Sequence, residues 1–163
     1  MESTGKIVSI LAGTYEGKIY EEDLALEHNY TLLRTRAQFA SLTTLALDGF
    51  AEKHPEMAFL HIFPGKVKTG FLARGVKSAI LKMLLGYIVE PIMTIGGIDM
   101  HDCGERMIWM ALDEQHAKGI WSLDFDGSES QSEELTRYRQ DRPLRQRIRM
   151  HDEQVFARAT TAI

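Results

Sequence analysis

Two residues at the start of a predicted helix, Tyr30 and Arg34, have side chains that could do chemistry. A tyrosine hydroxyl can donate a proton, and an arginine guanidinium can stabilise an enolate or a carboxylate. Residues four apart on a helix lie on the same face, so the two side chains would act together. The alternative is a tyrosine stacked on an arginine at the surface. We predict that Tyr30 and Arg34 are catalytic.

His61 is the third residue that we predict to be catalytic. It lies inside the apolar run 57–63 (MAFLHIF). Its imidazole is either buried and neutral, or close to the carboxyl end of a parallel strand, where open α/β sheets bind ligands. The run 101–105 (HDCGE) contains residue types that bind metals, but neighbours on one helix do not converge on one ion. No second His/Cys pair stands at zinc spacing, so we expect no metal site.

Composition limits the classes of protein that this chain can belong to. Its 163 residues, 44% hydrophobic and 26% charged, suit one domain with one core. A single cysteine, Cys103, excludes an internal disulfide and predicts a reducing, cytoplasmic location. The chain has no uninterrupted apolar stretch of about 18 residues and no signal-peptide pattern, so we expect no membrane-spanning segment. The net charge of −4 gives no reason to expect nucleic acid as a partner.

Apolar runs and one long helical pattern set the expected fold. A helix at 31–53 separates strands at 6–12 and 57–63, so these elements form a βαβ unit with parallel strands. A third strand and three more helices are expected at 120–125 and at 99–112, 133–138 and 144–159. The expected class is α/β, with a short parallel sheet of about three strands flanked by helices.

The helix at 31–53 is apolar on two faces, which indicates burial on both. One stripe contains Leu33, Ala37, Ala40, Thr44 and Leu47, and the other contains Phe39, Leu42, Ala46 and Phe50. Because the domain is small, we expect the second stripe to contact another copy of the chain. The prediction is a homodimer or higher homo-oligomer formed through this helix.

Four short pieces of the chain carry a family likeness. They are the strand 7–13, the loop residues 17–19 and 23–24, the run 64–69 (PGKVKT), and the run 102–106 (DCGER) followed by 111–112. In this order and spacing they resemble the second half of a short-chain dehydrogenase/reductase, especially the retinol-dehydrogenase-like branch and its fungal relatives. The likeness covers nearly the whole chain.

This resemblance implies a truncated Rossmann-like domain over residues 1–163. In such a domain, residues 71–98 form a substrate lid and residues 128–163 form the C-terminal helices. Thr69 matches the threonine that touches the nicotinamide end of the cofactor, or it caps the next helix. The lid is apolar and suits a hydrophobic substrate, core or dimer packing, a partner helix or a shallow membrane contact. The predicted substrate-binding residues are Tyr15, Thr69, Leu84 and Ile88.

The chain also departs from the family pattern. The glycine-rich phosphate loop of the family's first half is absent from this sequence, and that loop binds the dinucleotide. The family's catalytic serine falls on Ala12, or on Ile10 with a shift, and its tyrosine and lysine fall on Thr31 and Thr35. An arginine such as Arg34 does not release a proton and cannot replace the lysine. We therefore expect the isolated chain to use no cofactor.

Three functions remain open at this point. The first is a cofactor-independent isomerase, cyclase or dehydratase that acts on an apolar polyketide- or terpenoid-like intermediate in fungal natural-product biosynthesis. The second is an NADP-dependent oxidoreductase whose missing half comes from a partner chain. The third is a non-catalytic dimeric binding module.

Overall fold

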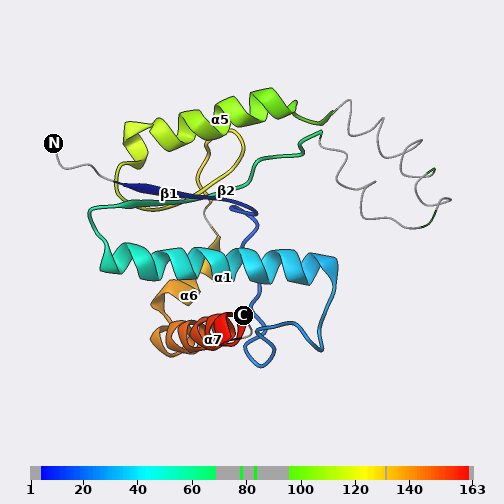
Figure 1. The fold of residues 1–163 in the computed structure, drawn as a ribbon, viewed down its shortest axis with the longest axis vertical. Helices are drawn as coiled ribbons and strands as arrows, with labels where there is room; N and C mark the ends of the chain where they lie inside the picture. Colours follow the sequence, from blue (N-terminus) through cyan, green and yellow to red (C-terminus); the bar gives the residue numbers. More distant parts are fainter. Residues whose placement is uncertain (1–4, 69–77, 79–82, 84–95, 131, 162–163) are drawn as a thin grey trace.

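Three short parallel strands form the sheet of this computed structural model, which describes residues 5–68, 78, 83, 96–130 and 132–161. They are β1 (Lys6–Ile10), β2 (Ala58–Ile62) and β3 (Gly119–Leu123), in the spatial order β1-β2-β3 (Figure 1). Both pairings are parallel, as the sequence predicts. The register aligns Ser9, His61 and Ser122 across the sheet.

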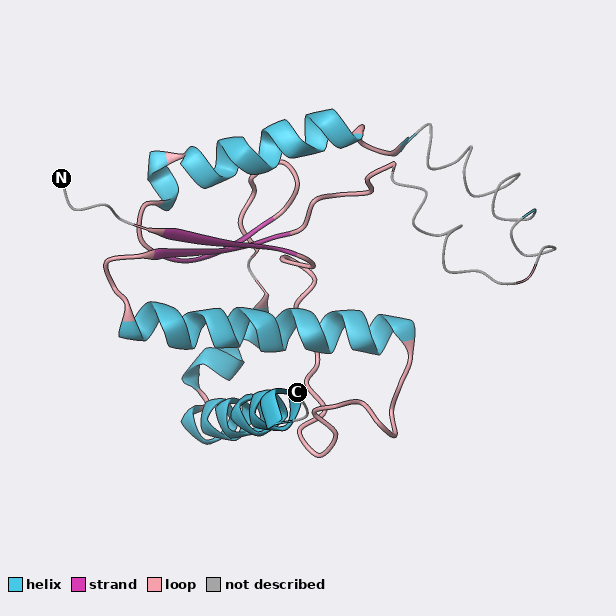
Figure 2. Cartoon of the chain, in the orientation of Figure 1, coloured by secondary structure: helices cyan, strands magenta, loops and turns pink. Residues whose placement is uncertain are grey.

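Helices cover both faces of the sheet, as Figure 2 shows. The long helix α1 (Leu32–Lys53) joins β1 to β2, and Thr31 caps it by accepting the backbone N–H of Arg34. Helix α5 (Met100–Leu112) covers the other face and begins at the predicted cap, Asp99. A short 3-10 turn (Glu114–His116) precedes β3. Helices α6 (Glu133–Gln140) and α7 (Arg142–Thr161) then pack beneath α1.

Two hydrophobic clusters fill the described part of the chain. The first lies between the sheet and α5, and it contains Ala58, Leu60, Ile62, Cys103, Met107, Met110 and Leu123. The second joins α1 to α6 and α7, and it contains Ile19, Leu42, Leu45, Leu135, Tyr138, Leu144 and Ile148. Helix α1 is therefore covered on one side by the sheet and on the other by helices of its own chain.

This arrangement changes the basis of the dimer prediction. Leu42, from the stripe expected to contact another copy, is 6% exposed and packs against α6 and α7. Phe39 and Phe50 from the same stripe remain 41% and 51% exposed. A dimer through α1 remains a prediction that nothing tests, and Phe39 and Phe50 are the residues of this stripe that stay accessible to a partner of any kind.

Most of the predicted lid at 71–98 lies outside the described residues, including Leu84 and Ile88. Thr69 also lies outside them. Among the helices that the structure describes, none has the length and apolar character needed to cross a membrane.

Two glycines sit where a side chain does not fit. A Cβ on Gly13 would lie 2.1 Å from the carbonyl oxygen of His61, so the chain after β1 passes directly against the backbone of β2. Gly65 has φ +82°, and a Cβ there would contact Ile98 and Phe125. Both positions belong to loops at the carboxyl ends of strands, and the close approach fixes the course of these loops.

We predict that Gly13→Ala lowers the free energy of unfolding by about 1–3 kcal/mol, because the new methyl group must displace backbone. Gly104→Ala is the matched control. Gly104 lies inside α5 and a Cβ there meets open space, so alanine should stabilise the protein by about 0.5–1 kcal/mol. Urea unfolding measures both changes. Equal stabilities for the two variants would contradict the predicted close approach.

Candidate functional site

The candidate site lies where the three parallel strands end. The loops 11–17, 63–68 and 124–130 follow β1, β2 and β3 and meet at this edge of the sheet. Helix α1 also begins here, because it runs back along the sheet from this edge (Figure 1). Ligands of open α/β sheets collect at this edge, which makes it the first place to search for chemistry.

A buried carboxylate, Glu16, joins the loop after β1 to three other elements. Its Oε1 accepts hydrogen bonds from the hydroxyl of Thr44 on α1, at 2.8 Å, and from the hydroxyl of Ser122 on β3. The hydroxyl of Ser130 lies 3.4 Å from its Oε2. The side chains of Glu16 and His61 are both fully buried. Burying a carboxylate costs free energy unless donors surround it, and these hydroxyls are the donors.

The hydrogen bonds of His61 fix the proton on its ring. Its Nε2 accepts the backbone N–H of Ala12 at 3.3 Å, so Nδ1 carries the hydrogen of the neutral ring. Nδ1 then donates to Thr44 Oγ1 at 2.8 Å, which leaves the Thr44 hydroxyl to donate to Glu16. Burial lowers the pKa of His61, and the Glu16 carboxylate, 3.8 Å away, opposes this only in part. The imidazole is therefore buried and neutral, which was one of the two alternatives from the sequence.

Further polar side chains on α1 hold the rest of the loop. The Oε1 atom of Gln38 accepts the N–H of Tyr20 at 2.7 Å, and its Nε2 donates to the carbonyl of Asp23. The hydroxyl of Ser41 bonds both the N–H and the carbonyl of Gly17. Gln38, Ser41 and Thr44 are spaced three apart and are all fully buried, so α1 presents a polar stripe to this loop.

Anchored in this way, the loop places Tyr15 at the surface beside Arg36. The Arg36 guanidinium lies 3.2 Å from the centre of the Tyr15 ring. Phe63, at the end of β2, packs edge-on against the same ring with centroids 4.6 Å apart. Tyr15 is 39% exposed and Arg36 is exposed. The group offers a phenol that can exchange a proton and a cation that can hold an oxygen anion.

In the structure, the predicted pair Tyr30 and Arg34 does not share a helix. Tyr30 precedes the cap residue Thr31, so it lies outside α1 and the argument from a shared helical face does not hold. Its side chain is 64% exposed. The Arg34 guanidinium lies 5.2 Å from the ring centre of Tyr20, so Arg34 stacks on a different tyrosine.

Sequence reasoning missed Glu16 and Arg36. Glu16 stands in a polar loop, where a carboxylate usually faces water, and no local signal marks it as buried. Arg36 stands two residues after Arg34 on α1, and only the fold shows which arginine meets Tyr15. Gln38, Ser41 and Thr44 could have indicated the buried network. They are spaced three apart on one buried face of a helix, and buried polar side chains need hydrogen-bond partners.

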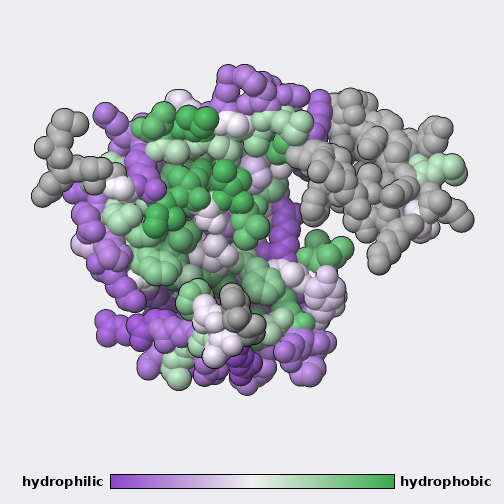
Figure 3. Space-filling model, in the orientation of Figure 1, coloured by the Kyte–Doolittle hydropathy of each residue, from purple (hydrophilic) through white to green (hydrophobic). Residues whose placement is uncertain are grey.

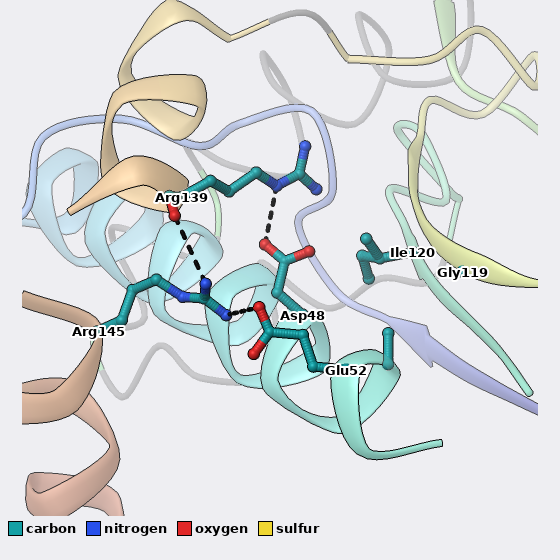
Figure 4. Close-up of a pocket in the computed structure, with 7 residues that line it drawn as sticks. Asp48, Glu52, Gly119, Ile120, Arg139 and Arg145 are labelled. Carbon is teal, nitrogen blue, oxygen red and sulfur yellow. Dashed lines mark hydrogen bonds and ion pairs between the residues drawn. The ribbon is translucent and has the colours of Figure 1, made fainter. Parts of the chain in front are cut away.

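A cavity of about 380 Å³ lies at the opposite, amino-terminal end of the sheet, where α1 ends and β3 begins. Its ion pairs join Arg139 to Asp48 at 2.8 Å and Arg145 to Glu52 at 2.7 Å (Figure 4). Burial raises the pKa of Asp48, and Arg139 offsets this only in part. Both guanidinium groups already have carboxylate partners, so these pairs tie α6 and α7 to α1.

In the part of the chain that the structure describes, the potential metal ligands that cluster are those of His101, Asp102 and Glu105 at the start of α5. Their ligand atoms lie within 4.8 Å of one another, and all three side chains are exposed. Exposed acidic groups commonly lie together without a metal, so we assign no ion to them.

Comparison with known proteins adds the final observation. No family model matches the chain, and no solved structure is significantly similar to it. It is 29% identical to oxidoreductase AN1596 of Emericella nidulans over 107 residues, which are 66% of this chain and 32% of that protein. It is 28% identical to oxidoreductase lepF of Aspergillus flavus over 75% of this chain and 39% of that protein. It is 31% identical to oxidoreductase andH of Emericella variicolor over 65% of this chain and 30% of that protein. The chain thus resembles fungal oxidoreductases and spans about a third of their length.

We predict that Glu16→Gln destabilises the fold by about 1–3 kcal/mol, the usual effect of disrupting a buried hydrogen-bonded group. The amide turns one acceptor into a donor and removes the charge that the hydroxyls of Thr44 and Ser122 stabilise. Glu22→Gln is the control, because Glu22 is exposed in the same loop and should change stability by less than about 0.5 kcal/mol. Chemical unfolding of both variants distinguishes a buried anchor from a surface carboxylate.

We also predict that stability decreases as the pH falls below about 6.5, the ordinary pKa of histidine. The pKa of His61 is lowered in the fold, so below 6.5 the unfolded chain binds a proton that the folded chain does not. The loss continues until the pH reaches the lower, folded pKa. Unfolding free energies measured between pH 8 and about pH 5 should show this slope. His61→Asn should remove most of this dependence of stability on pH. His28→Asn is the control, because His28 is exposed, and it should leave the dependence unchanged. If His28→Asn removes the dependence and His61→Asn does not, His61 is not its cause.

Proposed function

We propose that this chain forms one part of a fungal NAD(P)-dependent oxidoreductase of the short-chain dehydrogenase type, and that another polypeptide segment binds the dinucleotide. The observation that carries the proposal is its similarity to three fungal proteins named oxidoreductases, over about two thirds or more of this chain. Those names favour the redox hypothesis over the cofactor-independent isomerase, cyclase or dehydratase. The parallel sheet with loops converging at its carboxyl edge is compatible with such an enzyme.

The described residues do not fit the dinucleotide on their own. A phosphate-binding loop needs glycines whose backbone N–H groups are open to the ligand. Gly13, which follows β1, instead packs against the backbone of His61. In the first turn of α1, the backbone N–H of Arg34 already donates to the hydroxyl of Thr31. These features support assigning the cofactor to a segment outside this chain.

The role that we propose for this chain is on the substrate side. The Tyr15 hydroxyl would donate a proton to an oxygen anion formed on the substrate, and the Arg36 guanidinium would hold that anion. Arginine side chains do not act as proton donors in proteins, so the role of Arg36 is to supply a fixed charge. The apolar residues near this edge, Phe63 among them, suit a hydrophobic carbonyl compound as substrate.

A chimera tests this proposal directly. In it, this chain replaces the matched segment of oxidoreductase lepF of Aspergillus flavus. We expect the chimera to bind NADPH and to oxidise it with carbonyl substrates, and the isolated chain to do neither. Calorimetry and absorbance at the NADPH band measure the two steps. A micromolar dissociation constant for NADPH on the isolated chain would contradict the assignment of the cofactor, and a folded chimera without turnover would contradict the redox function.

Substitutions in the active chimera then identify the proton donor. Tyr15→Phe should slow turnover by roughly a hundredfold or more, the usual contribution of one acid–base group, because only the hydroxyl is removed. Tyr30→Phe is the comparison, since Tyr30 is also an exposed tyrosine in this region. If Tyr30→Phe slows turnover and Tyr15→Phe does not, Tyr30 is the donor and the assignment of Tyr15 is wrong.

A further inference from the structure

The edge of the sheet formed by β1 is open among the described residues. There β1 pairs only with β2, so its outer N–H and C=O groups have no strand beside them. The other edge is different, because the chain after β3 folds back on it. Leu123 bridges to Glu129, and the N–H of Ser130 donates to the carbonyl of Ser122 at 2.8 Å. Among the described residues, the chain therefore covers the carboxyl end of the β3 edge and leaves the β1 edge free.

The free edge carries apolar side chains. Ile7, Ile10 and Leu11 are 45%, 51% and 55% exposed, which is unusual for strand residues of a parallel sheet. The only charged residue of β1, Lys6, turns toward its own chain and donates to the carbonyl of Asp113 at 2.7 Å. The edge lacks the outward charges with which proteins commonly protect an open strand.

Helix α1 leaves the adjoining face of β1 uncovered. It packs mainly over β2 and β3, so Phe59 on β2 is 1% exposed while its neighbour in register, Ile7, is 45% exposed. Phe50 of α1 stacks on Phe59 with centroids 6.3 Å apart and is itself half exposed. Phe39 lies three turns earlier on the same side of α1. Figure 3 shows hydrophobic surface extending over this side of the molecule, from α5 across the sheet to α1.

The spacing of strands and helices indicates what fits on this surface. Neighbouring strands lie about 4.8 Å apart and packed helices about 8–10 Å apart, so one helix covers two strands. Helix α1 covers β2 and β3, so β1 and one further strand need a second helix beside α1. A second copy paired through β1 would place the two α1 helices roughly 20 Å apart and leave a gap one helix wide above both β1 strands.

We propose that the β1 face, which we define as Ile7, Leu11, Phe39 and Phe50, binds a strand and a helix from another polypeptide segment. The strand extends the sheet at β1, and the apolar side of the helix packs over Ile7 beside α1. The identity of the partner rests on the proposed function: it is the segment that binds the dinucleotide. The oxidoreductases that this chain resembles are about three times as long as the part it matches, so their remaining residues are numerous enough to supply such a strand and helix.

The test uses the part of oxidoreductase lepF that lies outside the matched segment, expressed as a separate polypeptide together with this chain. We expect a one-to-one complex by size-exclusion chromatography with light scattering. Ile7→Lys and Phe50→Lys should each weaken it by roughly tenfold or more. Val155→Lys and Phe156→Lys on α7 are matched controls, exposed by 49% and 71%, and should change affinity by less than about twofold. No step uses NADPH, so failure of the docking surface is distinguishable from failure of the redox function.

Two results would overturn the proposal. One is a self-dimer of twice 18.5 kDa that Ile7→Lys dissociates, because the face then belongs to a second copy. The other is a complex that the variants of the β1 face and the control variants on α7 weaken equally.

If the separate lepF part does not fold, the chimera provides the measurement. In the chimera, Ile7→Lys should lower the unfolding midpoint and Val155→Lys should leave it unchanged. In the isolated chain, neither substitution should change the midpoint, because both side chains are exposed. Equal midpoints for the two chimeras would also refute the proposal.

Discussion

The carboxylate of Glu16 is the constraint on which the carboxyl edge of this sheet depends. A buried carboxylate is stable only where donors replace the water that it has lost. Here the donors are the hydroxyls of Thr44 on α1 and Ser122 on β3. The Thr44 hydroxyl also accepts a hydrogen bond from Nδ1 of His61. One side chain from a loop thereby connects the long helix to two strands. Elements that are distant in sequence are held at one point.

This anchor determines what the loop after β1 can present. Because Glu16 points inward and Gly13 passes against the backbone of β2, Tyr15, which precedes Glu16, is placed at the surface. Arg36 of α1 and Phe63, which directly follows β2, then contact its ring from two sides. The buried network holds the loop, and the exposed group supplies the reactive atoms. A substrate site on this edge therefore needs the whole network, including residues that no substrate can reach.

The fold could be predicted from sequence further than the site could. Runs of apolar, β-branched residues around a long helical pattern predict the parallel βαβ unit, and the strands lie within two residues of their expected ends. The cap at Asp99 and the helices after β3 also follow from local signals. These features depend on residues that are close in sequence.

The site depends on contacts between distant residues, and there the sequence was less informative. Tyr30 and Arg34 have suitable types and spacing, but the helix begins at Leu32, so Tyr30 lies outside it and the two do not share a helical face. Glu16 looks like any loop carboxylate until α1 and β3 close over it. In the same way, the second stripe of α1 predicted a contact with another chain, whereas α6 and α7 of the same chain cover part of it. Local patterns show that a surface is buried, but they do not show what covers it.

Hydrogen exchange at the loop after β1 tests the central role of Glu16 most directly. The N–H of Thr14 donates to the Ser122 hydroxyl at 3.0 Å, and that of Gly17 donates to the Ser41 hydroxyl at 2.9 Å. If Glu16 holds this loop, both amides exchange as slowly as those of β2 in the native chain. In Glu16→Gln they should exchange much faster while the β2 amides remain protected. Fast exchange in the native chain, or unchanged protection in the variant, would contradict the account.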